Sequence, residues 1–207
     1  MFETIQQGGV FMWPLLLGSA IALAVGLERA IYFLRLSKAD RGYRTALERA
    51  LASGDLEQAA KLSQGTSPAH ACARAAVENW SQSSDVVDKA MTVQAMESEP
   101  ELNRFLGLLE TIVTAAPLIG LLGTITGMMG VFRAVAQKLG ADPHANTTGI
   151  TAGIGEALIA TATGILVAVT ALLIHNVCQA QAEARMTEAE QTAESVRLAH
   201  AKAGGGQ

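Results

Sequence analysis

The hydrophobic and polar positions of this chain are separated into long blocks rather than interleaved. Three stretches carry no acidic or basic residue: 4–27, 111–132 and 157–174. A bilayer core about 30 Å thick is crossed by about 20 helical residues, each rising about 1.5 Å. The pattern therefore predicts three transmembrane helices, which we place at 10–27, 111–132 and 147–176.

The polar blocks also predict helices. In 28–110, Gly54 followed by Asp55 predicts a helix end and a new helix start, and Ser67 before Pro68 predicts another start. We find no alternation of period two that would indicate a strand. The tail, 177–207, is rich in Ala, Glu and Gln before a final glycine run, and it predicts a long helix. We expect an all-α membrane protein: three transmembrane helices with long cytoplasmic helical extensions.

The placement of Lys and Arg predicts the orientation in the membrane. Basic residues gather in 28–110, only two lie in 133–146, and none precedes Arg29. Cytoplasmic loops carry an excess of Lys and Arg. We therefore expect 28–110 and 177–207 in the cytoplasm, and the segment 1–9 and the short loop 133–146 outside. Because a signal peptide needs a basic segment ahead of its apolar run, we expect the first helix to be retained.

The composition excludes several functional classes. Charged residues make up 16% of the chain and hydrophobic residues 50%, whereas about 25% of an average soluble protein is charged. The net charge of −4 argues against nucleic-acid binding. Cys72 and Cys178 form neither a disulfide framework nor a metal-ligand spacing, and the four histidines are isolated. We therefore expect no enzymatic activity, no cofactor and no metal site.

Glu156 is the first candidate for chemistry, because it stands at the start of the third apolar run. A carboxylate in or near hydrocarbon is costly, and it is by default a candidate for function. Two interpretations remain open at this stage. Glu156 either serves an ion pathway or lies in the interface, where it is solvated or caps the helix.

Threonines form the second set of candidates. Such hydroxyls commonly bond a carbonyl of their own helix, but their number in two neighbouring spans favours a face that contacts water. The threonines concerned are Thr124, Thr126, Thr161, Thr163 and Thr170.

Small residues form stripes on the same two helices, and such stripes are typical of close helix packing in lipid. We assign this packing role to Gly120, Gly123, Gly127, Ala160, Gly164 and Ala168. Prolines at positions 14 and 117 predict kinks in the first two spans.

Two runs containing these residues resemble a known family. The run APLIGLLGTITGM at 116–128 resembles the second-span signature of the MotA/TolQ/ExbB proton-channel family. The run GIGEALIATATG at 153–164 is similar to its third-span signature. The three-span layout and the short outer loop are most similar to the ExbB branch, with TolQ a close second.

The resemblance implies a homopentamer in the bacterial inner membrane, with a partner dimer of single-span ExbD or TolR proteins in its pore. A partner aspartate would carry the proton, and the complex would energise TonB-dependent outer-membrane transport or, as the alternative, the Tol-Pal envelope system. On the matching positions, the resemblance implies that Thr124 and Thr161 belong to the ion pathway and Glu156 to the pore mouth. The family usually has a proline near Thr170, so the local pore shape is left open.

Two other functional classes compete with this interpretation. A passive oligomeric scaffold would need the small-residue stripes but would have no use for Glu156 beside threonine faces. An intramembrane enzyme is the weaker rival, because we find no nucleophile, base or metal set in the spans. The residues do not decide between H⁺ and Na⁺.

Overall fold

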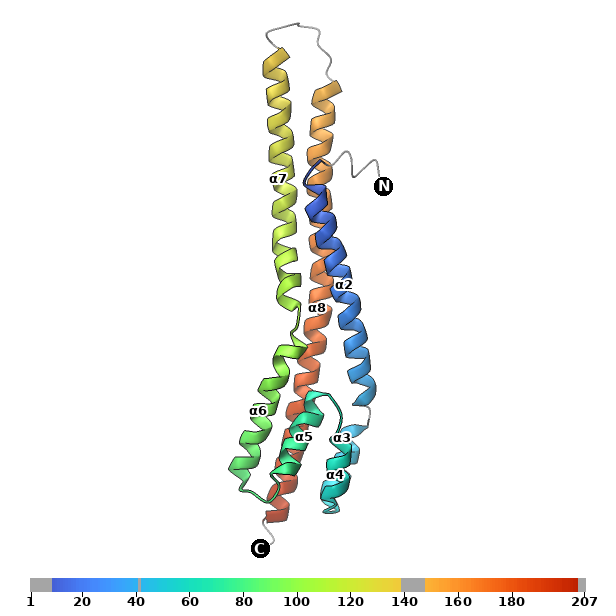
Figure 1. Ribbon diagram of the computed structural model, residues 1–207, viewed down its shortest axis with the longest axis vertical. Helices are drawn as coiled ribbons and strands as arrows, with labels where there is room; N and C mark the ends of the chain where they lie inside the picture. Colours follow the sequence, from blue (N-terminus) through green and yellow to red (C-terminus); the bar gives the residue numbers. More distant parts are fainter. Residues whose placement is uncertain (1–8, 41, 139–147, 205–207) are drawn as a thin grey trace. The chain divides into compact units, whose positions relative to one another are not determined.

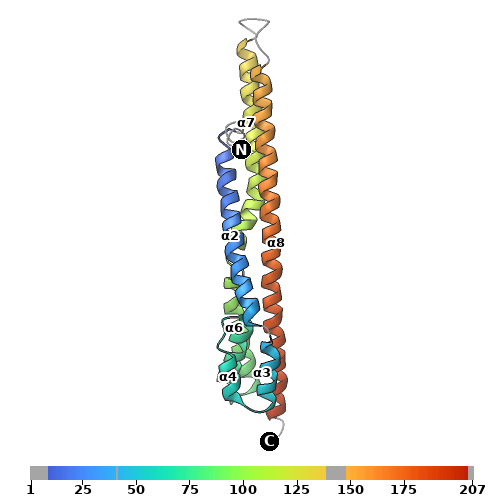
Figure 2. The same cartoon turned by 90° about the vertical axis from the view of Figure 1, so that its right-hand side faces the viewer.

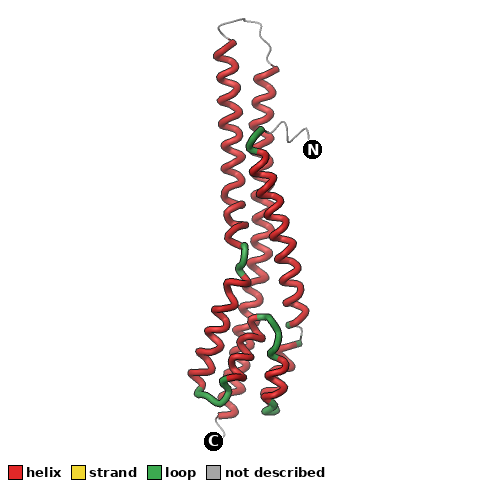
Figure 3. Tube along the Cα trace, viewed as in Figure 1, coloured by secondary structure: helices red, strands yellow, loops and turns green. Residues whose placement is uncertain are grey.

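The computed structural model describes residues 9–40, 42–138 and 148–204, and every regular element in these ranges is a helix (Figure 1; Figure 3). The expected all-α class is therefore confirmed. Most of the predicted outer segment 1–9 and of the predicted loop 133–146 lies outside the described residues. The helices are α2 (Met12–Ala39), α3 (Tyr43–Ala52), α4 (Leu56–Leu62), α5 (Pro68–Glu78), α6 (Ser84–Leu102), α7 (Leu106–Lys138) and α8 (Thr148–Gly204).

Three of the described helices are long and apolar enough to cross a membrane. The stretches are Met12–Ser37 in α2, Leu106–Arg133 in α7 and Gly153–Ala203 in α8. The last stretch has 51 residues, far more than the about 20 that a bilayer needs. Its acidic and basic residues resume at Glu183, so the apolar N-terminal part of α8 is the spanning part. The protein is a multi-pass membrane protein.

The chain divides into two compact units, which we describe separately. The first, which we call the span unit, comprises Met1–Leu27 and Phe105–Asn176. The second, which we call the polar unit, comprises Glu28–Arg104 and Val177–Gln207.

The span unit is built by α7 and the first part of α2 packing on the first part of α8. Helices α7 and α8 run side by side in both views of the ribbon (Figure 1; Figure 2). Close approach is possible because the contacting residues are small: Ala157, Ala160 and Ala171 of α8 are all at most 2% exposed. Leucines instead cover the outside of α7 and α8, where large apolar side chains suit lipid or a neighbouring subunit.

The polar unit has its own hydrophobic core, to which α3, α4, α5, α6 and α8 all contribute. Leu47 of α3, Met91 of α6 and Val196 of α8 are at most 1% exposed. Alanines of α5 fill the space between these larger side chains. The far part of α8 is thus a packed member of a helical bundle, as its buried alanines and Val196 require.

Local signals in the polar unit act as expected. Gly54 follows α3 with a φ of 75°, a conformation that favours glycine. Asp55 then caps α4 by accepting a hydrogen bond from the Gln58 N–H at 2.9 Å. Ser67 is the N-cap of α5, with Pro68 at its first position, where the missing proline N–H costs nothing.

The prolines act differently from the prediction of two kinked spans. Pro14 falls in the first turn of α2, which begins at Met12. Backbone N–H groups in a first turn have no intrahelical partner, so Pro14 removes no hydrogen bond there. Pro117 does lie inside α7, where a proline removes one bond of the helical ladder. Of Pro14 and Pro117, only Pro117 can therefore kink the helix in which it lies, α7.

Candidate functional site

The site is the contact between α7 and α8 in the span unit, and its geometry depends on glycine. A Cβ atom added at Gly164 would lie 2.6 Å from the Ala116 carbonyl oxygen, and one added at Gly120 would lie 3.0 Å from the Ala160 carbonyl oxygen. Both neighbours are backbone atoms, which cannot turn aside as a flexible side chain can. At these positions the two helices are close enough that only glycine fits without moving them.

The contact continues along the antiparallel pair. A Cβ atom at Gly123 would lie 2.7 Å from the Cβ of Ala160, and one at Gly127 would lie 3.1 Å from the Cβ of Ala157. Ala168 is also buried in this unit. Five of the six residues predicted to pack, Gly120, Gly123, Gly127, Ala160 and Gly164, therefore lie at the interface between the two helices.

Thr161 lies within this close contact and bonds across it. Its Oγ1 donates to the Gly120 carbonyl oxygen at 3.0 Å. That carbonyl is reachable because Gly120 brings the α7 backbone near the Cα of Thr161. The hydroxyl hydrogen is thereby used, while the hydroxyl oxygen keeps lone pairs that can accept a hydrogen bond.

The four other candidate threonines of the two spans bond carbonyls of their own helix. Thr124 Oγ1 donates to the Leu121 carbonyl at 2.6 Å, and Thr163 Oγ1 donates to the Ile159 carbonyl at 2.8 Å. Thr126 and Thr170 bond within their helices in the same way. The structure thus separates Thr161 from the others by a contact that helical spacing alone could not show.

Glu156 falls in α8, one turn before Ala160, and its side chain lies outside the described part of the structure. Along α8, Glu156 therefore comes just before Ala157, Ala160 and Thr161, which lie at the contact with α7. Thr161 is hydrogen-bonded to α7, whereas the hydrogen bond of Thr124 stays within its own helix.

Sequence reasoning missed Arg29, which it counted only among the basic residues that set orientation. Arg29 is 1% exposed, and its guanidinium stands 4.5 Å above the ring of Tyr32. Its Nη1 donates to the Glu101 carbonyl at 2.9 Å and its Nε to the Glu28 carboxylate at 2.6 Å. The adjacent Glu28 was the only signal in the sequence, and it does not reveal the Glu101 carbonyl, which is distant in the chain.

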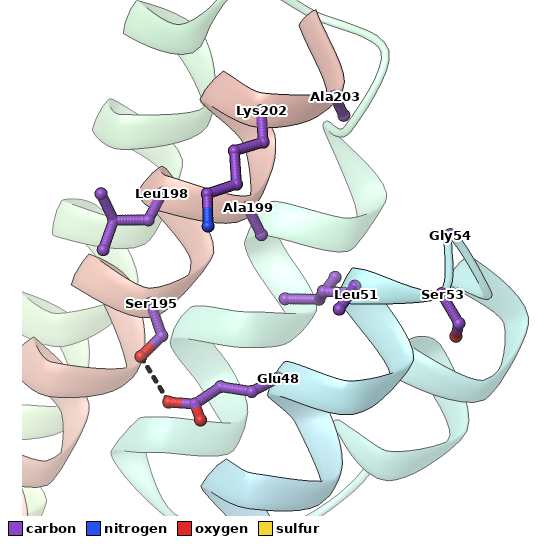
Figure 4. Close-up of a pocket in the computed structure, with 10 residues that line it drawn as sticks. Glu48, Leu51, Ser53, Gly54, Ser195, Leu198, Ala199, Lys202 and Ala203 are labelled. Carbon is purple, nitrogen blue, oxygen red and sulfur yellow. Dashed lines mark hydrogen bonds between the residues drawn. The ribbon is translucent and has the colours of Figure 1, made fainter.

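A groove of about 610 Å³ lies in the polar unit between the ends of α3 and α8 (Figure 4). Ser195 Oγ donates to Glu48 Oε1 at 2.8 Å beside it, and Lys202 lines it. None of the residues predicted for the ion pathway lines this groove, so we keep the α7–α8 contact as the candidate site.

Comparison with known proteins gives an independent result. The sequence profile of the MotA/TolQ/ExbB proton channel family matches residues 64–191, which include the α7–α8 contact. Biopolymer transport protein ExbB-like 1 of Synechocystis sp. is 36% identical over 181 residues, covering 86% of this chain and 70% of that protein. ExbB-like 3 of the same organism is 33% identical, covering 83% and 81%.

A shorter match reaches the TolQ branch. The Tol-Pal system protein TolQ of Pseudomonas aeruginosa is 36% identical over 97 residues, covering 47% of this chain and 40% of that protein. The resemblance seen in the two span signatures is thus confirmed by a match over most of the chain. This chain belongs to the MotA/TolQ/ExbB proton channel family.

Proposed function

We propose that this protein is the multi-span subunit of an ExbB-like motor complex in the bacterial inner membrane. It would conduct protons together with an ExbD-like single-span partner and so energise TonB-dependent outer-membrane transport. The observation that carries the proposal is the hydrogen bond from Thr161 to Gly120, inside a chain of this family. This hydroxyl is a polar group at the contact of two largely apolar helices, and its oxygen keeps lone pairs that can accept a hydrogen bond.

The extent of the matches favours the ExbB branch over TolQ. The ExbB-like relatives match this chain over more than four fifths of its length, whereas the TolQ relative matches less than half. A TolQ-like role in envelope integrity is the alternative. Both roles share the same proton chemistry and differ in the envelope system that the complex energises.

The proposed assembly is a homopentamer with a partner dimer in its pore. The exposed leucines of α7 and α8 supply apolar surface for neighbouring subunits or lipid. The proposed topology puts the N-terminus outside and the C-terminus in the cytoplasm, because Lys and Arg gather after the first span.

Thr161 would accept a hydrogen bond from the partner aspartate while that aspartate is protonated. Since the Thr161 hydrogen is already donated to Gly120, its oxygen is free to accept from a carboxylic acid O–H. To donate to the charged carboxylate, the Thr161 hydroxyl would first have to break its hydrogen bond to the Gly120 carbonyl. Hydroxyl reorientation would thus accompany each proton transfer.

The decisive experiment reconstitutes the chain in vesicles with and without its single-span partner, the product of a neighbouring gene. We expect native mass spectrometry to give five copies of this chain with two of the partner, and proton uptake driven by a membrane potential only when both are present. Monomers alone, or an uptake that needs no partner, would contradict the proposal. An assembled pentamer that never conducts would favour the passive scaffold.

A further inference from the structure

Four ionisable side chains gather in the polar unit. They are Asp40, just after α2, His70 in the first turn of α5, and Arg185 and Glu188 of α8. The side chains of Asp40 and His70 are 8% and 6% exposed, and that of Arg185 is 10% exposed. We call this group the Asp40 cluster.

One guanidinium nitrogen joins the two carboxylates of the cluster. Arg185 Nη1 is 3.2 Å from Asp40 Oδ2 and 2.6 Å from Glu188 Oε2. Two carboxylates face one guanidinium, so when both are ionised these three side chains carry a net charge of one negative unit. A net charge is costly in a buried place, so the cluster gains by taking up one proton.

His70 lies beside the second carboxylate oxygen of Asp40. Its Nδ1 is 2.6 Å from Ser67 Oγ and 3.3 Å from Asp40 Oδ1. Among the described residues, Asp40 Oδ1 receives no hydrogen bond. A hydrogen on Nδ1, which a neutral imidazole can carry, would supply this bond if it is directed to the oxygen.

The imidazole ring has little freedom to turn away. It stacks on Tyr43, with ring centroids 3.7 Å apart. On another side, a Cβ added at Gly65 would lie 2.6 Å from the ring's Nε2. Although Ser67, His70 and Asp40 are the residue types of a hydrolytic triad, a triad needs hydroxyl and carboxylate on opposite ring nitrogens. Here both meet Nδ1, so the arrangement is not a triad.

The cluster reaches solvent through Glu188. This side chain is 42% exposed, and with Asp40 it lines a cleft of about 340 Å³. Among the described side chains, Tyr43 and Arg44 of α3 also line the cleft, and Arg44 pairs with Glu48. Cys72 and Arg74 of α5 act electrostatically on Tyr43.

We propose that the Asp40 cluster is a proton-binding site, and that uptake of one proton stabilises the packing of α8 against α5 and against the residue that follows α2. The proton belongs to the coupled pair of carboxylates, Glu188 and Asp40. The site lies outside the spans and stands independently of the proposed proton pathway.

The pKa directions agree with this geometry. Burial raises the pKa of Glu188 above its ordinary 4.5, and the neighbouring Asp40 adds to the effect. Burial also acts to raise the pKa of Asp40, but His70, Ser67 and Arg185 outweigh it, so the pKa lies below 3.8. The stabilisation of the fold that comes from protonated Glu188 is complete below pH 4.5 and is lost as the pH rises through the folded pKa of Glu188. The stabilisation that comes from ionised Asp40 is complete above pH 3.8 and is lost only in stronger acid.

Hydrogen exchange of the full chain in nanodiscs tests the proposal between pH 4 and 7, with rates corrected for the intrinsic chemistry, because a raised Glu188 pKa makes stability depend on pH only above pH 4.5. We expect the opening equilibrium of α5 and of 185–196 to rise with pH, by up to about tenfold per pH unit for one proton. Glu188→Gln changes a half-exposed side chain and should flatten this dependence without unfolding the protein. Asp40→Asn should flatten it too.

Two control variants make the result specific. Glu57→Gln removes an exposed partner of Lys61 and should keep the wild-type pH dependence. His200→Gln removes the other histidine packed in this unit, which bonds the Trp80 carbonyl, and should also keep it. The proposal is overturned if wild-type protection is independent of pH, if Glu188→Gln keeps the full dependence, or if His200→Gln abolishes it.

Discussion

The hydroxyl of Thr161 on α8 donates to the backbone carbonyl of Gly120 on α7 at 3.0 Å. Thr124, Thr126, Thr163 and Thr170 each bond a carbonyl of their own helix, whereas Thr161 bonds the other helix, beside the close contacts of Gly120 and Gly164. The hydroxyl therefore has two properties at once. It joins two helices, and its oxygen remains available to a partner.

We expect Thr161→Val to abolish most proton flux while leaving the pentamer assembled. Valine keeps the shape and loses the hydroxyl, and an interhelical hydrogen bond in a membrane typically contributes only about 0.6 kcal/mol. Thr161→Ser should retain much of the flux because it restores the oxygen. The measurement is potential-driven uptake in vesicles with matched protein levels.

Thr163→Val is the matched control, because its hydroxyl bonds only the Ile159 carbonyl of its own helix. Its effect on flux should be mild. A larger loss for Thr163→Val than for Thr161→Val would mean that the pathway lies on the other face of α8.

We expect Gly164→Ala to destabilise the span unit by about 1–3 kcal/mol, the usual range for an overpacked contact. The added methyl group would lie 2.6 Å from the Ala116 carbonyl oxygen, so α7 and α8 must separate. Gly130→Ala is the control, because nothing lies within 4 Å of its new methyl group. It should be neutral or stabilise the helix by up to about 1 kcal/mol. Thermal unfolding in detergent compares the two, and equal midpoints would refute the close contact.

We expect Glu156→Gln to reduce flux without preventing assembly. A carboxylate at a pore mouth raises the local concentration of cations, and the amide does not. The reduction should shrink at high ionic strength, where the field of the charge is screened. Flux equal to the wild type at low salt would indicate that Glu156 is only interfacial.

We expect Cys72 to resist alkylation in the native chain at pH 8. Its side chain is buried in the polar unit at 1% exposure, and burial raises the pKa of the thiol from 9.0 to about 11. Because the fold favours the protonated thiol, its contribution to stability is complete below pH 9 and is lost as the pH rises toward 11. Mass spectrometry after maleimide treatment gives the rate, and the denatured chain is the reference. A native rate equal to the denatured rate would contradict a buried Cys72.

The sequence by itself determined the class of the protein. Three uncharged runs are long enough to cross a bilayer, and that length requirement follows from the helical rise alone. The signals at Gly54, Asp55 and Ser67 located helix ends because capping depends on residues adjacent in the chain. The signatures around Gly120 and Thr161 were enough for the family, since they too are local runs.

Only the tertiary structure decided which side chains meet. Thr161 and Thr163 look alike in the sequence, and they differ because one faces the Gly120 carbonyl of a helix 41 positions away. Asp40 and Arg185 are 145 positions apart, and each reads as an ordinary surface charge. Burial turns them into a coupled pair, because helix packing removes water from both at once, and no local pattern carries that information.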